Sequence, residues 1–369
     1  MPAEKVVEQR RQTRQKLELM ERYWGAWCMI LAQARRYWFC PTRLWLVDTH
    51  AGSGSHASTT DPDGKIEGTP ALAALKAREV QRRFPDVEIR VRATDKDKAT
   101  AALLLAAMRP YKGTPPDGVN LEVGNVDWTK AVPWVAAEIA QEDHPHGGRP
   151  IRGGSHGHKS LWFIDPYGVE SLDHSVIESL PSGAEVIVNL DLMALLRHAG
   201  KAAGDRPTEA LLAKVFDGTS WKAAANQPSP HQALADAYAD SFPRWPHRNA
   251  YLLRVSGSQD RAMVHLTDSP KAVTAFRKEI ETSLRAGTLA AGGALTTIQR
   301  DQAAVDLFGQ FRGFTLTTRE MAAVLPRFNL TQLRTICRTA DANRYGRWDE
   351  KAGAMEWFAE RSRELGLFD

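Results

Sequence analysis

The sequence feature that most constrains this chain is an apolar run that ends in an acid and is followed by two closely spaced glycines. Residues 44–47 read Leu-Trp-Leu-Val, Asp48 comes next, and Gly52 and Gly54 follow within the same short stretch. Such a run is typical of a buried parallel strand that leads into a tight turn, where glycines let a ligand approach the backbone. We therefore expect a phosphate- or nucleoside-binding turn at the carboxyl end of this strand.

A second apolar run ends in an acid in the same way. Residues 161–164 read Leu-Trp-Phe-Ile, and Asp165-Pro166-Tyr167-Gly168 follows. In an open α/β sheet, ligands bind at the carboxyl ends of the strands, near the point where the strand order reverses. We expect Asp48 and Asp165 to lie side by side at that edge and to border one cavity.

Strand-like and helix-like patterns alternate around these two runs. The alternation predicts an α/β fold with a doubly wound, mostly parallel Rossmann-like sheet, and a closing antiparallel hairpin is the pattern of class I methyltransferases. We expect further strands at residues 87–94, 119–123 and 184–190, the hairpin at 251–255 and 262–266, and helices at 98–108, 128–141, 173–180, 209–216, 232–241 and 270–284.

The chain divides into three parts. Residues 1–42 form a basic arm and an amphipathic helix, in which apolar residues recur mostly at spacings of three and four. We expect this helix to pack on the edge of the sheet; the alternative is a groove in which its aromatic side chains bind bases. Residues 43–285 form the methyltransferase-like Rossmann domain, and a Gly- and Ala-rich linker leads to a small domain at 295–369.

The small C-terminal domain resembles a winged helix-turn-helix. Residues 318–325 and 330–340 have the pattern of two helices around a tight turn. The second helix and the turn after it carry Arg334, Arg338, Arg344 and Arg347. These arginines predict a nucleic-acid-binding face. The alternative is a helical cap with a solvated basic surface.

Composition limits the class of protein. The chain has 369 residues, of which 43% are hydrophobic and 25% charged, and its formal net charge of +4 permits nucleic-acid binding without requiring it. No apolar run reaches the ~18 residues of a membrane span, and the basic N-terminus lacks the apolar core of a secretory signal. Three cysteines without a Cys-x-x-Cys pair indicate a reduced, cytoplasmic protein.

A histidine-rich stretch separates the helix at 128–141 from the strand at 161–164. It contains His144, His146, His156 and His158 among several glycines. Histidines gathered in this way can bind a metal. Nothing in the stretch fixes the geometry of the ligands, so we interpret it as a flexible insertion without a metal.

The glycine turn is the first element of a predicted S-adenosylmethionine site. Ala51, Gly52 and Gly54, together with Asp48, supply the close backbone turn that the methionine part of this cofactor needs. A nicotinamide dinucleotide fits the turn less well, because Ala57 occupies the place of the third glycine of Gly-x-Gly-x-x-Gly.

Polar residues after the next two strands complete this predicted cofactor site. Asp95 ends the second strand, where the acid of dinucleotide-binding folds contacts the ribose hydroxyls. Asn125 or Asp127, after the third strand, stands where the adenine contact is expected. Each residue alone is more typical of a polar loop; it is their order along the chain that favours a cofactor.

The Asp165-Pro166-Tyr167-Gly168 segment is the catalytic candidate. It resembles the Asp/Asn-Pro-Pro-aromatic motif of methyltransferases that act on adenine or cytosine amines, and the Asp-Pro-Phe-Gly of a tRNA guanine dimethyltransferase family. Asp165 would orient an exocyclic amine, and Tyr167 would stack on an extruded base. Tyr167 replaces the second proline and Gly168 the aromatic, which leaves the base open. The alternative is a strand-ending acid with a proline turn.

Taken together, these motifs resemble the three-Cys-motif partner family, a phage- and bacterium-associated group with a methyltransferase-like fold. The resemblance covers roughly residues 16–285, and His50 replaces the aromatic residue that is usual in the family. It implies a partner, a radical-SAM-like protein with three clustered cysteines, and joint modification of nucleic acid. The matching segments are residues 48–54, 68–70, 163–168 and 188–190, followed by Met193 and Arg197.

Two residues near the fifth strand have expected roles of their own. Asn189, at the end of that strand, is expected beside Asp165, where it would hold substrate or shape the pocket. Arg197 would contact a phosphate. Either residue could instead cap the following helix. Two functions therefore stay open: a nucleic-acid methyltransferase, and a non-catalytic cofactor- or DNA-binding partner protein.

Overall fold

In the computed structural model, the chain forms two compact units, residues 1–283 and residues 284–369. In the first helix, side chains are described from Lys16 onward. The structure describes residues 3–34, 43–57, 65–142, 159–202, 204–255, 259–285, 290–291, 315–318, 320–321, 333, 336–338, 340–341, 346–349, 352 and 354–357.

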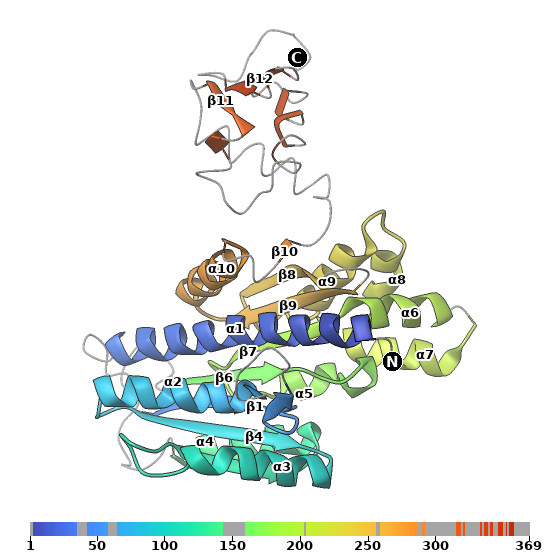
Figure 1. Ribbon diagram of the computed structural model, residues 1–369. Coiled ribbons are helices and arrows are strands. Elements are labelled where there is room, and N and C mark those ends of the chain that lie inside the picture. The colour runs from blue at the N-terminus through green and yellow to red at the C-terminus, as the bar shows by residue number, and fades with distance from the viewer. Residues whose placement is uncertain are drawn as a thin grey trace, which may run out of the picture. The chain divides into compact units, whose positions relative to one another are not determined.

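Seven strands of the first unit lie in one sheet, in the order β8-β9-β7-β6-β1-β4-β5 (Figure 1). All neighbours pair in parallel except β9, which is antiparallel to both β7 and β8. The predicted doubly wound sheet with a closing hairpin is thus confirmed. The strands are β1 (Arg43–Asp48), β4 (Glu88–Asp95), β5 (Asn120–Asn125), β6 (Lys159–Ile164), β7 (Glu185–Asp191), β8 (His247–Val255) and β9 (Gln259–Thr267).

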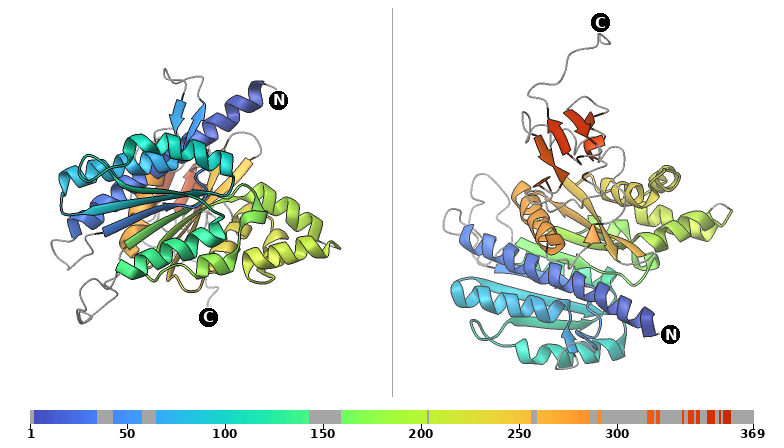
Figure 2. Two further views of the ribbon diagram at one scale, coloured as in Figure 1. Left: turned by 90° about the horizontal axis from the view of Figure 1, so that it is seen from below. Right: turned by 45° about the horizontal axis from the view of Figure 1, so that its top comes forward.

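Helices cover both faces of this sheet (Figure 2). One face carries α1 (Ala3–Ala34), α2 (Thr69–Arg83), α3 (Lys98–Met108) and α10 (Pro270–Arg285). The other carries α4 (Trp128–Glu142), α5 (His174–Glu178), α6 (Leu192–Ala202), α7 (Arg206–Phe216), α8 (Ser220–Ala225) and α9 (Pro230–Asp240). Short 3₁₀ turns lie at Arg109–Tyr111 and Val169–Ser171.

The alternation of side chains along each strand decides which residues face α1. Trp162 and Ile164 point into the core beneath α4–α9, so Phe163 and then Asp165 point to the α1 face. In β7, Val186 and Val188 belong to the same core, which places Asn189 on the α1 side. The strand period therefore brings Asp165 and Asn189 to one face of the sheet.

The helix α1 packs across the face of the sheet, not along its edge as the sequence suggested. The ring of Trp24 lies 6.2 Å from that of Phe163 in β6, and Trp24 is fully buried. Tyr23 Oη and Trp27 Nε1 both donate hydrogen bonds to the carboxylate of Glu185, the latter over 3.1 Å. These aromatic side chains anchor the helix, so they do not form an open groove for bases.

Some helices and strands were not predicted from the sequence. Helix α8 lies in a segment for which no helix was expected, whereas α6 is the helix expected, without stated bounds, after the fifth strand. The polar stretch after Gly54 contains a small hairpin, formed by β2 (Ser55–Ala57) and β3 (Lys65–Glu67), which pair antiparallel. The hairpin closes where Gly68 N donates to Gly54 O over 2.9 Å.

The second unit contains a three-stranded antiparallel sheet in the order β11-β13-β12. Its described buried residues include Leu333, Ile336 and Met355. Most of the two helices expected at 318–340 lie outside the described residues, so the winged-helix assignment stays a prediction. The strands of this sheet are β11 (Thr315–Thr317), β12 (Gly346–Asp349) and β13 (Ala354–Trp357); the two-residue strand β10 (Ala290–Ala291) is not part of it.

Among the described residues, every helix is too short or too polar to cross a lipid bilayer.

The space around Gly68 and around Gly200 predicts opposite effects of a Gly→Ala substitution on stability. A Cβ at Gly68 would lie 2.8 Å from the carbonyl carbon and oxygen of Gly54, whereas a Cβ at Gly200, inside α6, meets nothing within 4 Å. Gly68→Ala should lower the free energy of unfolding by about 1–3 kcal/mol. Gly200→Ala should raise it by roughly 0.5–1 kcal/mol, because alanine favours the helix. Chemical denaturation followed by tryptophan fluorescence measures both; equal stability of Gly68→Ala and the unchanged protein would contradict the packing described here.

Candidate functional site

The carboxyl ends of β4, β1 and β6 meet at one edge of the sheet. Asp48, the last residue of β1, stands opposite Ala93 of β4 and Phe163 of β6. The chain leaving β1 is tied to both neighbours, since Thr49 N donates to Phe163 O over 3.2 Å and Ala51 N donates to Thr94 O over 3.0 Å. The expected juxtaposition of Asp48 and Asp165 is therefore present.

The two glycines of the turn have different tasks. Gly52 has φ +61°, and a Cβ built on it would meet nothing within 4 Å, so the space beside its backbone is open. Gly54 has φ +74°, and a Cβ there would lie 2.9 Å from Leu104 Cδ1 of α3. Gly52 thus offers its backbone to a ligand, whereas Gly54 allows the turn to pack on α3.

Asp95 is bonded directly to this turn. Its Oδ2 accepts a hydrogen bond from Gly52 N over 3.2 Å, and its Oδ1 accepts one from Asp97 N over 2.9 Å. A carboxylate has about four acceptor positions, so the oxygens of Asp95 can still accept hydroxyl donors. The acid and the open glycine that were predicted to share a nucleoside are therefore neighbours.

Asn125 and Asp127 lie beside this pair but make local bonds. Asn125 Nδ2 donates to the backbone oxygens of Asp95 and Lys96, each over 3.1 Å. Asp127 Oδ1 accepts hydrogen bonds from Thr129 N over 3.0 Å and Thr129 Oγ1 over 2.8 Å, at the start of α4. Partial burial opposes ionisation of Asp127, but the bonds from Thr129 hold its pKa below the usual value. Asp127 thus acts as a helix cap, and Asn125 shapes the loop around Asp95.

Asp48 is almost completely buried beneath the turn. Thr69 Oγ1 of α2 donates to its Oδ2, and His50 N donates to its Oδ1 over 3.1 Å. Burial is the largest effect on this carboxyl and, with the negative charge of Asp165, it raises the pKa of Asp48 to about 7 despite these bonds. Asp48 therefore organises the turn from inside and is shielded from ligands.

His50 lies at the centre of the acidic residues. Burial lowers its pKa to about 4, although the charges of Asp165, Asp127 and Asp95 act in the opposite direction. Its ring packs at a tilt against that of Trp128, with the centroids 5.6 Å apart. The imidazole is thus neutral at pH 7. In the sequence, His50 stands out only as a departure from a family pattern, so this central place was not predicted.

Asp165 accepts a hydrogen bond on each carboxylate oxygen. Asn189 Nδ2 donates to Oδ1 over 2.6 Å, as its place at the end of β7 predicted, and Lys16 Nζ of α1 donates to Oδ2. Burial alone would raise the pKa of Asp165, but the charge and hydrogen bond of Lys16 and the bond from Asn189 outweigh it and lower the pKa. Asp165 is therefore an anion at neutral pH. Lys16 was not among the site residues predicted from the sequence.

Tyr167, two residues after Asp165, is 97% exposed. Gly168 behind it has φ +94°, and the following Glu170 pairs with His198 of α6 over 3.1 Å. A large aromatic side chain with this exposure, held on a short turn beside an anionic strand end, offers a stacking surface.

The arginines predicted to bind nucleic acid belong to α6 and to the second unit. Arg197 is exposed on α6, several residues beyond the end of β7. Arg338 and Arg347 are exposed in the second unit. Arg334 and Arg344 lie outside the described residues.

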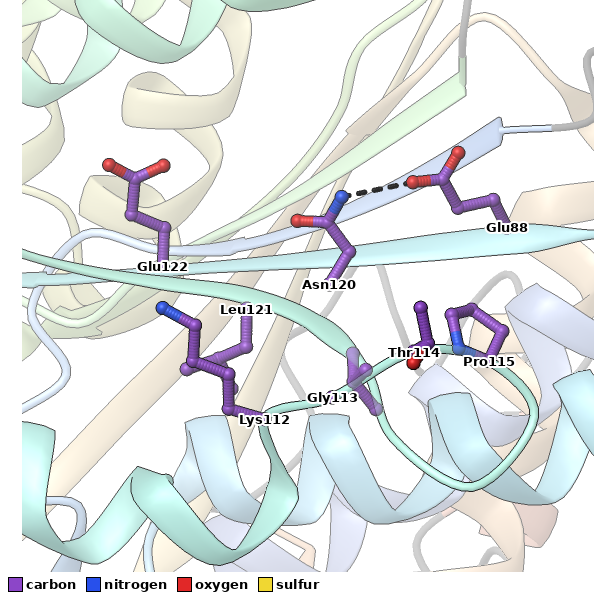
Figure 3. A pocket seen from close by; sticks show the side chains of 9 residues that line it. Glu88, Lys112, Gly113, Thr114, Pro115, Asn120, Leu121 and Glu122 are labelled. Carbon is purple, nitrogen blue, oxygen red and sulfur yellow. Dashed lines mark hydrogen bonds between the residues drawn. The ribbon is translucent and has the colours of Figure 1, made fainter.

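A hollow lies at the opposite end of the sheet from these strand ends (Figure 3). It has a volume of about 460 Å³ and is lined by the loop after α3 and the first residues of β5. In it, Asn120 Nδ2 donates to Glu88 Oε1 over 3.0 Å. Glu88 begins β4 and Asp95 ends it, a separation of roughly 23 Å at 3.3 Å per residue. The hollow is therefore separate from the predicted site.

Metal and thiol chemistry receive little support from the described residues. None of them forms a group of three or more His, Cys, Asp or Glu arranged to hold a metal ion. The four histidines of residues 144–158 lie outside the described part of the chain. Cys28 and Cys337 are free and buried, and burial raises the pKa of both thiols. Cys40 is outside the described residues.

Comparison with known proteins finds similar solved structures but no matching sequence. No protein-family model and no curated protein sequence matches the chain. Similar solved structures include protein LPL1258 from Legionella pneumophila, with 12% identity and a TM-score of 0.38 over 72% of this chain and 92% of that one. A second is the methyltransferase domain of a bacterial Hen1 protein, with 12% identity and a TM-score of 0.29 over 68% of this chain and 100% of that one. A third is the SAH-bound methyltransferase PaMTH1 of Podospora anserina, with 15% identity and a TM-score of 0.25 over 66% of this chain and 78% of that one.

The order and the directions of the strands identify the fold of the first unit. Five parallel strands in the order β7-β6-β1-β4-β5, extended by the antiparallel hairpin of β9 and β8, form the sheet of a class I methyltransferase-like fold. The glycine turn, Asp95 and Asp165 all lie at the carboxyl ends of these strands, where this type of sheet binds ligands.

The raised pKa of Asp48 predicts a specific pH dependence of stability. In an unfolded chain, an aspartate side chain has a pKa of about 3.9, whereas the pKa of Asp48 in the folded chain is about 7. The folded state therefore binds more protons in this window, and Asp48 makes the protein less stable as the pH rises. Asp48→Asn removes this titration. We compare the free energy of unfolding of the wild type with that of Asp48→Asn. The wild-type value minus the Asp48→Asn value should fall by a few kcal/mol between pH 4 and pH 7, because each unit by which the pKa of Asp48 is raised corresponds to about 1.4 kcal/mol.

Chemical denaturation of both proteins across this pH range measures that difference. The titrations of His50 and Asp165 occur in both proteins and largely cancel in the comparison. A difference that stays constant with pH, or that rises, would contradict the burial of Asp48.

Proposed function

We propose that this protein is an S-adenosylmethionine-dependent methyltransferase that acts on nucleic acid. The observation that carries the proposal is the arrangement of Gly52, Asp95 and Asp165 at the meeting point of three parallel strand ends. Gly52 and Asp95 would form the cofactor half of the site, and Asp165 would form the half that holds the methyl acceptor.

The residues of the turn fit the cofactor. The space beside Gly52 admits a ligand against the backbone, and Asp95 carries carboxylate oxygens for two ribose hydroxyls. Asn125 holds the loop that would border the adenine through its bonds to the backbone after β4. When bound, S-adenosylmethionine supplies an electrophilic methyl group.

Asp165 and Tyr167 would act on the methyl acceptor. Asp165 would accept a hydrogen bond from an amine and stabilise the positive charge that develops on its nitrogen. Asn189 fixes one oxygen of that carboxylate, so it would align Asp165. The exposed ring of Tyr167 would stack on an extruded base, as enzymes that modify bases require. Together these groups suit the exocyclic amine of a nucleobase.

The further parts of the proposal rest on the family resemblance and on charge. The three-Cys-motif partner family would place a radical-SAM-like protein beside this chain in joint modification of nucleic acid. The exposed Arg338 and Arg347 of the second unit, with Arg334 and Arg344, would contribute phosphate contacts, and Arg197 of α6 would add one beside the first unit's site.

A second candidate function is that of a non-catalytic partner protein. The observation that favours it is the pairing of Asp165, whose two oxygens already accept bonds from Lys16 and Asn189. Such a fold could bind the cofactor, or DNA, and serve a partner without transferring a methyl group.

Cofactor binding tests both functions at the glycine turn. A long side chain at Gly52 would fill the open space, so Gly52→Arg should weaken S-adenosylmethionine binding by at least about 100-fold, or roughly 2.8 kcal/mol. Gly204→Arg is a matched control, because Gly204 also has a positive φ (+95°) and open space around its Cβ. Isothermal titration calorimetry measures both. Equal affinity in the two variants would exclude the turn as the cofactor site.

Methyl transfer separates the enzyme from the partner protein. Asp165→Ala and Tyr167→Ala should each reduce transfer of a labelled methyl group to purified DNA or RNA by at least about tenfold, since removal of charge stabilisation commonly costs this much or more. Leu103→Ala, at an exposed apolar residue of α3, should have no effect. Cofactor binding without transfer to any nucleic acid, by the chain alone or with its partner, would favour the non-catalytic function.

A further inference from the structure

The ion pair between Lys16 and Asp165 joins two distant parts of the chain. The two residues are separated by 149 positions, and their side chains are 20% and 16% exposed. Asn189 holds the other oxygen of Asp165, over 2.6 Å. The pair therefore lies in a partly buried place, where an ion pair is screened less than at a surface.

The helix α1 positions Lys16 here because it is anchored about two to three turns further along the helix. Tyr23 and Trp27 bind Glu185, the first residue of β7. At 1.5 Å per residue, Lys16 lies roughly 10–16 Å along the helix from those anchors. At 3.3 Å per residue, Asn189 lies about 13 Å along β7 from Glu185. A helix that runs along the strand thus brings Lys16 level with Asn189 and Asp165.

Charged and titratable groups face Asp165 from several elements. Lys16 of α1 and Arg261 of β9 favour its anion, while Asp48 of β1 opposes it. His50, after β1, also faces Asp165 and stays neutral at pH 7. Lys16 is the cation in direct contact. Without Lys16, the rise that burial causes in the pKa of Asp165 would be opposed mainly by the hydrogen bond from Asn189 and the more distant charge of Arg261.

Among the described residues around Asp165, none is suited to removing a proton from a cationic amine. Lysine-like ammonium groups have pKa values of about 10.4, and a general base works best with a pKa near the operating pH. The pKa of Asp165 lies below its usual value, and that of His50 is about 4. Asp48 has a pKa of about 7, but it is 2% exposed and both its oxygens accept hydrogen bonds.

We propose that Lys16 is a positioning and specificity residue, which fixes the Asp165 carboxylate and restricts methyl acceptors to nitrogens that are uncharged at neutral pH. The ammonium of Lys16 repels a second cation beside Asp165, whereas the exocyclic amine of a nucleobase is neutral and can donate to the free acceptor positions of the carboxylate. This inference rests on the methyl transfer proposed above.

The proposed step balances without a protein base. The lone pair of the neutral nitrogen forms a bond to the methyl carbon while the sulfur–methyl bond of S-adenosylmethionine breaks and sulfur keeps the electron pair. The nitrogen becomes positively charged beside Asp165, and its extra proton then passes to water. A protonated alkylamine has no free lone pair, so it cannot enter this step.

The effect of Lys16 on Asp165 can be measured without any enzymatic activity. In protein labelled with ¹³C-carboxyl aspartate, NMR follows the titration of Asp165, whose signal is assigned from Asp165→Asn. Lys16→Met should move the titration midpoint to higher pH by at least about one unit, as the loss of a contacting opposite charge does, and Lys16→Arg should restore it. An unchanged midpoint in Lys16→Met would overturn the proposal.

Lys76→Met is a matched control for α1. Lys76 of α2 pairs with Glu21 of α1 over 3.2 Å and its side chain is 22% exposed, so this variant removes a similar ion pair of the same helix away from Asp165. It should leave the titration of Asp165 unchanged. An equal shift in Lys76→Met would show that loosening of α1, not the charge of Lys16, is the cause, and would also overturn the proposal.

Acceptor choice tests the specificity. The wild type should methylate an oligonucleotide with adenine and cytosine but not a lysine peptide. Lys16→Met should be at least about tenfold slower on the oligonucleotide, with the acidic limb of its pH profile at higher pH, and Lys16→Arg should recover both. Methylation of the lysine peptide by the wild type would overturn the inference. No transfer to either acceptor would contradict the proposed function, while the NMR titration still decides the role of Lys16.

Discussion

The parallel pairing of β1 with a strand on each side is the constraint on which the candidate site depends. Because β4 and β6 both run in the same direction as β1, their last residues meet at one edge, and backbone bonds from Thr49 and Ala51 tie the turn to both neighbours. The open backbone of Gly52, the acid Asp95 and the strand-end Asp165 all occupy their places for this reason. A change of register in β1 would separate them.

Several carboxyl groups gather at this edge, and the structure accommodates each in a different way. Asp95 accepts bonds from backbone amides, Asp48 is buried with a raised pKa, and Asp165 is neutralised by a lysine from another part of the chain. Like charges in a small, partly buried region are costly unless they are paired or protonated. This division gives one partly buried acid for the cofactor, Asp95, and one aligned anion for the acceptor, Asp165.

The sequence predicted the features that local pattern encodes. Apolar runs ending in Asp48, Asp95 and Asp165 identified the strands and their order in the chain, and the place of Asn189 at a strand end predicted its contact with Asp165. It could not predict Lys16, because a contact across 149 positions leaves no local periodicity. The start of α4 at Trp128 was predicted, but the role of Asp127 as its cap was not, because an acid at that place is also typical of a ligand-binding strand end.

The most direct test of the account is hydrogen exchange, followed by mass spectrometry, with and without S-adenosylmethionine. The account predicts that the cofactor slows exchange in the peptides that contain Ala51–Gly54 and Asp95–Asp97, at the ends of β1 and β4. Exchange in residues 112–122, which line the hollow at the other end of the sheet, should stay unchanged. Protection confined to residues 112–122, or absent from the whole chain at saturating cofactor, would contradict it.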